Sequence, residues 1–215
     1  MTCWSANSVN VVLPLKKQVA ELSAEASRAL IIYVHPRHQN SYGNYELLSA
    51  VADLPQVTVH DLYEEYPDFF IDVAREQELL RNHDLIIFMF PLYWYSAPAL
   101  LKEWQDRVLD YGFAYGLSRH EEAPEDDRTA LSGKTLWVVT TAGGPVNSYR
   151  EGAVNSRPLD DYLRPYEQTA HLCGMHWHLP FAVYRVRKLT LAYLQQKAQE
   201  FRATLLACLQ ETDNA

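Results

Sequence analysis

The chain has 215 residues, 48% of them hydrophobic, which is enough for one globular domain with a substantial core. Its formal net charge of −8 argues against nucleic acid as a partner, because phosphate binding requires a basic face. Cys3, Cys173 and Cys208 are few and scattered, which indicates a reducing compartment without a disulfide framework. The sequence has neither a signal-peptide pattern nor a bilayer-length apolar run, so we expect a cytoplasmic protein.

Short apolar runs of strand type alternate with helical patterns along the chain. In chain order, the pattern predicts helix Leu15–Ala26, strand Ala29–Val34, helix Tyr42–Ala52, strand Val57–Leu62, helix Ile71–Asn82, strand Leu85–Phe90, a helix after Pro98 that carries Leu100, Trp104, Val108 and Tyr111, strand Thr135–Thr140, helix Pro158–Cys173, strand Leu179–Val186 and helix Leu189–Leu209. This alternation predicts an α/β fold, a doubly wound five-stranded parallel sheet in the flavodoxin-like order 2-1-3-4-5. We expect that domain to cover residues 29–210, after an N-terminal extension of residues 1–28.

The loop after the first predicted strand reads HPRHQNSYGN, from His35 to Asn44. Ser41, Gly43 and Asn44 lie where this loop turns into a helix, so hydroxyl, amide and backbone N–H groups converge at the positive end of a helix dipole. Such a site can hold a phosphate, and His35 can hydrogen-bond the same group. The alternative is that Ser41 or Asn44 only caps the helix.

Two further loops follow the third and fourth predicted strands. Pro91–Ser96 (PLYWYS) places aromatic rings after the most apolar strand, which by itself indicates a core plug or subunit interface rather more than a wall for a flat ring system such as a flavin. Thr140–Gly144 (TTAGG) offers small residues that let a backbone approach a planar ligand, or forms an ordinary glycine turn. Because all three loops follow parallel strands, we expect them to meet at one edge of the sheet.

The loops, their order and their spacing resemble the flavodoxin-like NAD(P)H:quinone oxidoreductases. The stretches VTVHDLYEEYPDFFIDVAREQELL and PLYWYSAPALLKEWQDRVL are similar to the ancillary subunits of glutathione-regulated potassium-efflux antiporters. The resemblance covers about Arg28 to Glu200. It implies flavin-binding positions at His35, Ser41, Tyr42, Gly43, Asn44, Pro91, Leu92, Tyr93, Trp94, Tyr95, Thr140, Thr141, Ala142, Gly143 and Gly144.

The resemblance implies FMN or FAD as cofactor and NAD(P)H as co-substrate, with hydride transfer to a quinone-type acceptor. It also implies a homodimer with the pocket at the interface. Tyr149 matches a family tyrosine that acts beside the flavin, and it is the candidate catalytic residue. Asn155 stands where the quinone reductases have a histidine, and Ala142 stands where the family commonly has a glycine.

Two classes of function follow from the resemblance. The first is a flavin-dependent NAD(P)H oxidoreductase. The second is a regulatory subunit, peripheral on the inner face of the membrane, that binds and activates an antiporter with little turnover of its own. The acids and aromatic residues of YEEYPDFFID favour partner binding.

A metal site was weighed at His171, Cys173, His176 and His178, because His176 and His178 would share one face of a strand. Their spacing repeats no known zinc motif, so packed or capping histidines are the preferred interpretation and no metal is expected. A GxSxG nucleophile elbow is absent from the sequence, which excludes the usual α/β-hydrolase site.

Overall fold

The computed structural model describes residues 26–36, 42–116 and 129–213. Their centre is a five-stranded parallel sheet in the order β2-β1-β3-β4-β5, so the predicted fold class and strand order are confirmed. The strands are β1 (Ala29–Tyr33), β2 (Val57–Asp61), β3 (Leu85–Pro91), β4 (Thr135–Thr141) and β5 (His176–Val183).

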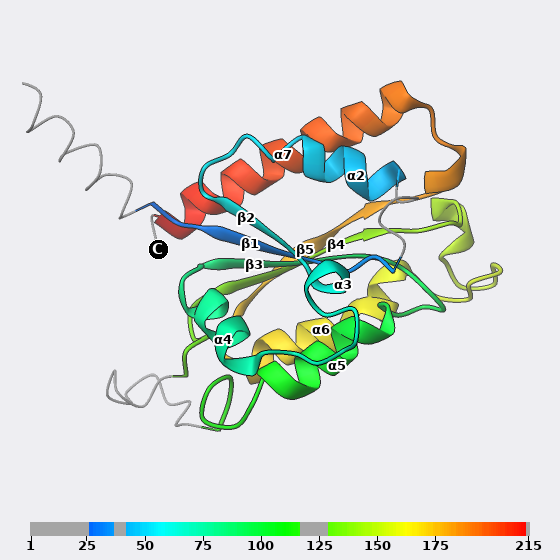
Figure 1. Ribbon diagram of the computed structural model, residues 1–215. Helices are drawn as coiled ribbons and strands as arrows, with labels where there is room; N and C mark the ends of the chain where they lie inside the picture. The colour runs from blue at the N-terminus through cyan, green and yellow to red at the C-terminus, as the bar shows by residue number, and fades with distance from the viewer. Residues whose placement is uncertain (1–25, 37–41, 117–128, 214–215) are drawn as a thin grey trace, which may run out of the picture.

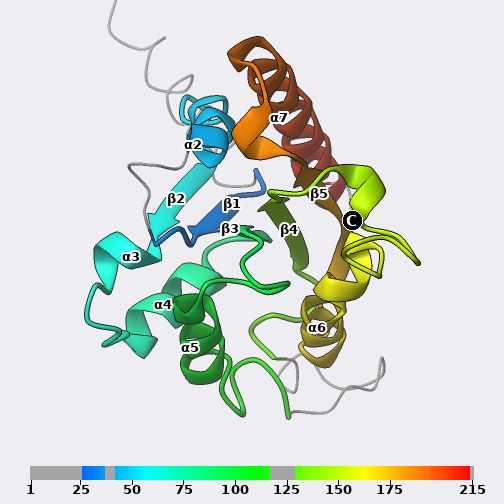
Figure 2. The same ribbon diagram turned by 90° about the vertical axis from the view of Figure 1, so that its right-hand side faces the viewer.

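Helices cover both faces of the sheet. They are α2 (Tyr42–Ser49), α3 (Leu62–Glu65), α4 (Val73–Arg81), α5 (Ala99–Val108), α6 (Leu159–Leu172) and α7 (Leu191–Asp213), with short 3-10 turns η3 (Val146–Ser148) and η4 (Val186–Lys188). Figure 1 shows α2 and α7 on one face and α4, α5 and α6 on the other, and Figure 2 shows the same layers along a second direction. None of the described helices has the length and apolar character needed to cross a membrane.

The sheet is apolar on both faces because successive side chains of its central strands point to opposite layers. Leu30 and Ile32 of β1 join the core cluster beneath α5 and α6, whereas Ile31 joins the cluster beneath α2 and α7. Fully buried aromatic rings fill each layer, Trp104 of α5 on one side and Phe201 of α7 on the other. The two cores together fix the sheet and therefore the edge at which its loops meet.

The fifth strand departs from the prediction, because it runs from His176 to Val183 rather than over Leu179–Val186. As an edge strand, β5 is only partly buried, so its first residues lack the continuous apolar pattern of the central strands. It also contains Pro180, which an edge strand tolerates because one of its sides needs no backbone donor, and its register with β4 shifts between Trp137 and Val139.

Two other predictions differ from the structure or lie outside it. The helix after Pro98 ends at Val108, so Tyr111 lies beyond it and is 67% exposed. The predicted helix Leu15–Ala26 and the extension of residues 1–28 fall almost wholly outside the described residues.

Candidate functional site

A pocket of about 730 Å³ opens where the carboxyl ends of β1, β3 and β4 meet. This volume lies in the range of small-molecule and cofactor sites. The residues that line the pocket are His35, Tyr42, Gly43, Asn44, Pro91, Leu92, Tyr93, Thr141, Gly143, Val186, Arg187 and Leu189. All three loops singled out in the sequence therefore reach one pocket, at the edge of the sheet where this topology binds ligands.

The first wall is formed by the end of β1 and the start of α2. His35 is 7% exposed, and its ring lies 6.2 Å from the rings of both Tyr33 and Tyr93. Asn44 is 1% exposed, and its Oδ1 has no hydrogen-bond partner among the described residues. A buried acceptor without a protein partner is costly, so Asn44 Oδ1 favours a ligand group that can donate a hydrogen bond to it, while the N-terminal turn of α2 favours an anionic group beside it. Ser41 lies outside the described residues.

The second wall is a tight turn that follows β3. Backbone hydrogen bonds pair Tyr93 with Ser96 at 2.8 and 3.0 Å, and the two residues between them have positive φ, 49° at Trp94 and 64° at Tyr95. Hairpin turns of this kind normally carry Asn or Gly, so two bulky aromatic residues there indicate strain of the kind found at functional sites. The turn leaves Trp94 94% exposed, beside a second hollow that shares Leu92, Tyr93 and Arg187 with the main pocket.

The third wall is the loop after β4, and its residues divide into two groups. Thr141 and Gly143 line the pocket, and an added Cβ on Gly143 would meet open space. Thr140 is buried in the sheet, where its hydroxyl donates to Phe90 O at 2.9 Å, and Ala142 is fully buried with its N–H bonded to Val183 O. These two candidate residues therefore hold the loop in place rather than facing the pocket, and Gly144 lies just outside the lining.

Tyr149 lies behind Gly144 rather than in the pocket lining. Its ring packs against Tyr184, with centroids 5.5 Å apart, and against Tyr162 at 6.4 Å. Burial, together with the nearby Tyr95 and Tyr162, raises the pKa of Tyr149, so its hydroxyl stays protonated at neutral pH.

Asn155 connects the aromatic and glycine loops. Its Nδ2 donates to Ser148 Oγ at 2.7 Å, and its Oδ1 accepts from the hydroxyl of Tyr95 at 3.4 Å. Its backbone carbonyl also accepts a hydrogen bond from the hydroxyl of Tyr162, whose ring lies against Tyr95. The residue that replaces the family histidine is thus engaged in structural hydrogen bonds, and an amide carries no proton that titrates near neutral pH.

Sequence reasoning missed the fourth wall, which is formed by Val186 and Arg187 of η4 and by Leu189. The predicted fifth strand ends at Val186, whereas β5 stops at Val183 and the chain then turns over the pocket. The cluster of basic residues in RVRK was the available signal, since a pocket for an anionic ligand needs positive charge.

The histidines weighed as metal ligands do not converge. No group of three His, Cys, Asp or Glu side chains that could hold a metal occurs within the described part of the chain. His178 instead places its ring 5.0 Å from that of Trp137, and its Nδ1 lies 2.9 Å from Leu179 O.

Comparison with curated proteins gives ancillary proteins of potassium-efflux systems among the relatives of this chain. The glutathione-regulated potassium-efflux system ancillary protein KefG of Cronobacter sakazakii is 45% identical over 184 residues, which cover 86% of this chain and 95% of that protein. The resemblance to ancillary subunits of potassium-efflux antiporters is therefore confirmed.

Among solved structures, this chain is similar to a quinone reductase and to a protein in complex with FMN. A protein from P. pentosaceus described as an NADPH-quinone reductase is 33% identical, with a TM-score of 0.70, over 81% of this chain and 95% of that one. The general stress protein 14 of Treponema denticola, solved in complex with FMN, is also 33% identical, with a TM-score of 0.74, over 86% of this chain and 99% of that one. The family model described as a flavodoxin-like fold matches residues 27–205, so the chain belongs to this flavodoxin-like family.

Proposed function

We propose that the pocket binds FMN and that the protein transfers a hydride from NAD(P)H to a quinone-type acceptor. The observation that carries the proposal is the convergence of α2, the aromatic turn and the glycine loop on one pocket of about 730 Å³. The complex of the Treponema denticola relative with FMN supports the choice of cofactor. FAD is the alternative flavin.

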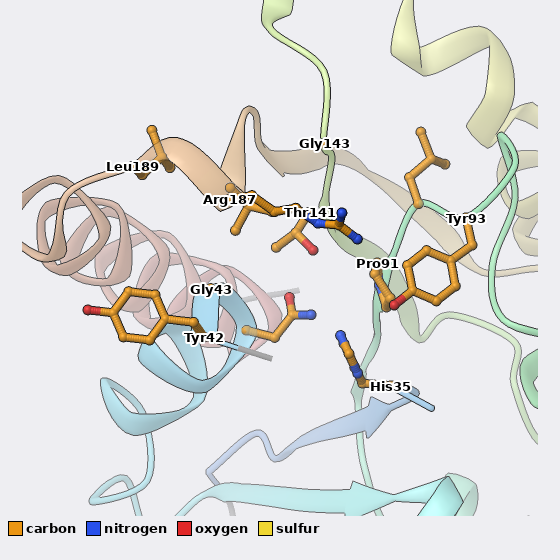
Figure 3. A pocket seen from close by; sticks show the side chains of 12 residues that line it. His35, Tyr42, Gly43, Pro91, Tyr93, Thr141, Gly143, Arg187 and Leu189 are labelled. Carbon is orange, nitrogen blue, oxygen red and sulfur yellow. The ribbon is translucent and has the colours of Figure 1, made fainter. Parts of the chain in front are cut away.

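The lining fits a flavin on physical grounds. The N-terminal turn of α2, where Asn44 lies, offers backbone N–H groups that suit a phosphate, and the buried Asn44 Oδ1, which has no partner among the described residues, suits a ligand group that donates a hydrogen bond. Tyr93 and the backbone at Gly143 border the same space, which suits a flat ring with polar edges (Figure 3). A bound flavin would supply the two-electron redox chemistry, and the protein would supply binding and orientation.

The residues around the pocket have distinct roles in this proposal. His35 and Asn44 hold the phosphate end, Tyr93 and Trp94 flank the ring, and Gly143 allows close approach of the backbone. Tyr149 lies beside Gly144 at the edge of the pocket and is protonated at neutral pH, so we assign it the role of the family tyrosine, a hydrogen-bond donor to the acceptor. Asn155 holds the loops in register and transfers no proton.

The test uses the full-length protein and added FMN. We expect binding that quenches flavin fluorescence, together with oxidation of NAD(P)H that depends on a small quinone. Replacing Tyr149 with Phe should lower kcat while leaving FMN affinity unchanged, because that hydroxyl lies outside the pocket lining. Absence of flavin binding would rule out the proposal, and binding without turnover would rule out the enzymatic half.

A second function, that of an ancillary subunit on the cytoplasmic side of a potassium-efflux antiporter, is supported by the KefG relatives, of which the chain covers almost the full length. It is also supported by α3 and the segment after it, where Phe70 is 80% exposed and the acidic residues Glu64 and Asp68 are exposed too. An exposed aromatic side chain beside acids is a typical contact for a partner with an apolar, basic surface.

This second function predicts direct binding to the antiporter's cytoplasmic domain. We expect Phe70→Ser to weaken that binding at least tenfold while FMN affinity stays the same, since Phe70 does not line the pocket. Equal binding by the wild type and the variant would remove this segment from the interface. Failure of the wild type to bind would remove the second function.

A further inference from the structure

The described lining of the pocket is positively charged, although the chain as a whole is acidic. The chain carries a formal net charge of −8, yet no acidic side chain belongs to the lining of either the main pocket or the adjoining hollow within the described residues. Arg187 lines both, and among the described residues it is the one permanently charged side chain in either set. Among the described residues it forms no ion pair with an acidic group.

The backbone around Arg187 is held in place from two sides. The N–H of Arg185 donates to Gly144 O at 3.0 Å and that of Val186 to Ala142 O at 3.2 Å, which fixes η4 to the glycine loop. On the other side, Val186 packs so closely on α2 that a Cβ added to Gly43 would lie 2.1 Å from Val186 Cγ2. This prior ordering of the backbone reduces the entropy lost when Arg187 binds a ligand.

The guanidinium of Arg187 shares the pocket with other groups that can bind an anion. Figure 3 shows Arg187 and His35 extending toward the same space, which Thr141 and Pro91 also line. Asn44 and the N-terminal turn of α2 border that space too, and a helix N-terminus adds further positive potential. Arginine is suited to a phosphate group because its planar N–H donors can pair with two oxygens at once.

We propose that Arg187 is a specificity-determining residue that makes the pocket select a phosphorylated flavin, FMN, over riboflavin, by pairing with the phosphate group. This inference rests on the proposed flavin function and adds a residue that lies outside the three loops. The hydrogen bonds and charge attraction are lost when either the phosphate or the guanidinium is removed.

The experiment compares FMN and riboflavin titrations of four full-length proteins: the wild type, Arg187→Ala, Arg187→Lys and Lys188→Ala. We expect the wild type to bind FMN more tightly than riboflavin. Arg187→Ala should weaken FMN binding about tenfold or more and leave riboflavin binding unchanged, because charge-assisted hydrogen bonds contribute at least that factor. Arg187→Lys should recover part of the loss, since lysine keeps the charge without the two-pronged geometry.

Lys188→Ala is the matched control, because Lys188 is the next cation in η4 and does not line the pocket. It should leave both affinities unchanged. Equal loss of FMN and riboflavin binding in Arg187→Ala, or loss in neither, would overturn the inference while leaving the flavin function intact. A wild type that binds no flavin would overturn both.

The same variants separate two sources of phosphate. NADPH carries a 2′-phosphate that NADH lacks, so a guanidinium that recognised the nucleotide would change the ratio of the two KM values. We expect that ratio to stay the same in Arg187→Ala. A changed ratio with unchanged FMN affinity would assign Arg187 to the nucleotide and make the proposal wrong.

Discussion

At the level of single residues, Gly43 constrains the pocket wall because Val186 leaves no room for a Cβ at this position. An added Cβ would lie 2.1 Å from Val186 Cγ2, and valine has few rotamers with which to move away. We expect Gly43→Ala to lower the free energy of unfolding by about 1–3 kcal/mol, the usual cost of overpacking. Urea denaturation would measure this loss, and FMN titration would show whether the displaced loop also weakens binding.

Two further variants make that prediction specific. Gly143→Ala is the control for stability, because its added Cβ meets no atom within 4 Å. Combining Gly43→Ala with Val186→Ala should recover much of the lost stability, since the clashing methyl groups are gone. If Gly43→Ala unfolds at the same urea concentration as the wild type, Val186 does not constrain α2.

At the scale of elements, a buried carboxylate joins β2, α4 and α5. Glu76 of α4 is fully buried and accepts hydrogen bonds from His60 Nε2 at 2.8 Å, Tyr66 Oη at 2.5 Å and Trp104 Nε1 at 2.8 Å. Burial alone would raise the pKa of Glu76, but the three donors together outweigh it and lower the pKa. This network anchors the segment that leads to the exposed Phe70.

We expect Glu76→Gln to lower the free energy of unfolding by about 2–4 kcal/mol, because the amide turns an N–H group toward a donor and leaves buried partners unpaired. Glu78→Gln is the matched control in the same helix, since Glu78 is exposed. It should cost less than about 0.5 kcal/mol. Equal losses in the two variants, measured by urea denaturation, would show that the buried network adds no more to the free energy of unfolding than an exposed glutamate does.

The same network predicts a pH dependence. The folded pKa of Glu76 lies below its ordinary value of 4.5, so the carboxylate stabilises the fold above that pH. Its contribution is lost as the pH falls through the folded pKa. Wild-type stability should therefore drop between neutral pH and pH below about 4 more steeply than that of Glu76→Gln. Parallel pH profiles would contradict this assignment.

At the scale of the whole molecule, the aromatic turn beside the pocket favours a homodimer. Trp94 is 94% exposed and Tyr42, at the other side of the opening, is 52% exposed. Large exposed aromatic side chains next to a pocket are typical of a contact surface. We expect sedimentation to give the mass of two chains and Trp94→Glu to raise the dimer dissociation constant at least tenfold.

Leu179→Glu is the control for that prediction, because Leu179 is also an exposed apolar residue, at 77%, but does not line the pocket. It should leave the dimer intact. A wild type that sediments as one chain would count against the interface and against any role for Tyr149 that depends on a second subunit.

The sheet and three of the pocket walls can be predicted from the amino-acid pattern alone. The strand order follows from apolar runs that must be buried on both faces, and parallel strands bring the loops that follow them to one edge. His35, Asn44, Tyr93 and Gly143 could therefore be predicted as neighbours although they come from separate parts of the chain.

The fourth wall, which closes the pocket, depends on long-range packing instead. The edge strand β5 carries a weak pattern, so where it ends depends on pairing with β4 rather than on its own residues. The turn that follows is fixed by contacts of Val186 with Gly43 and Ala142, which lie far away in the chain and leave no local signal. Arg187 consequently reaches the pocket through long-range packing, which no periodicity of its own segment encodes.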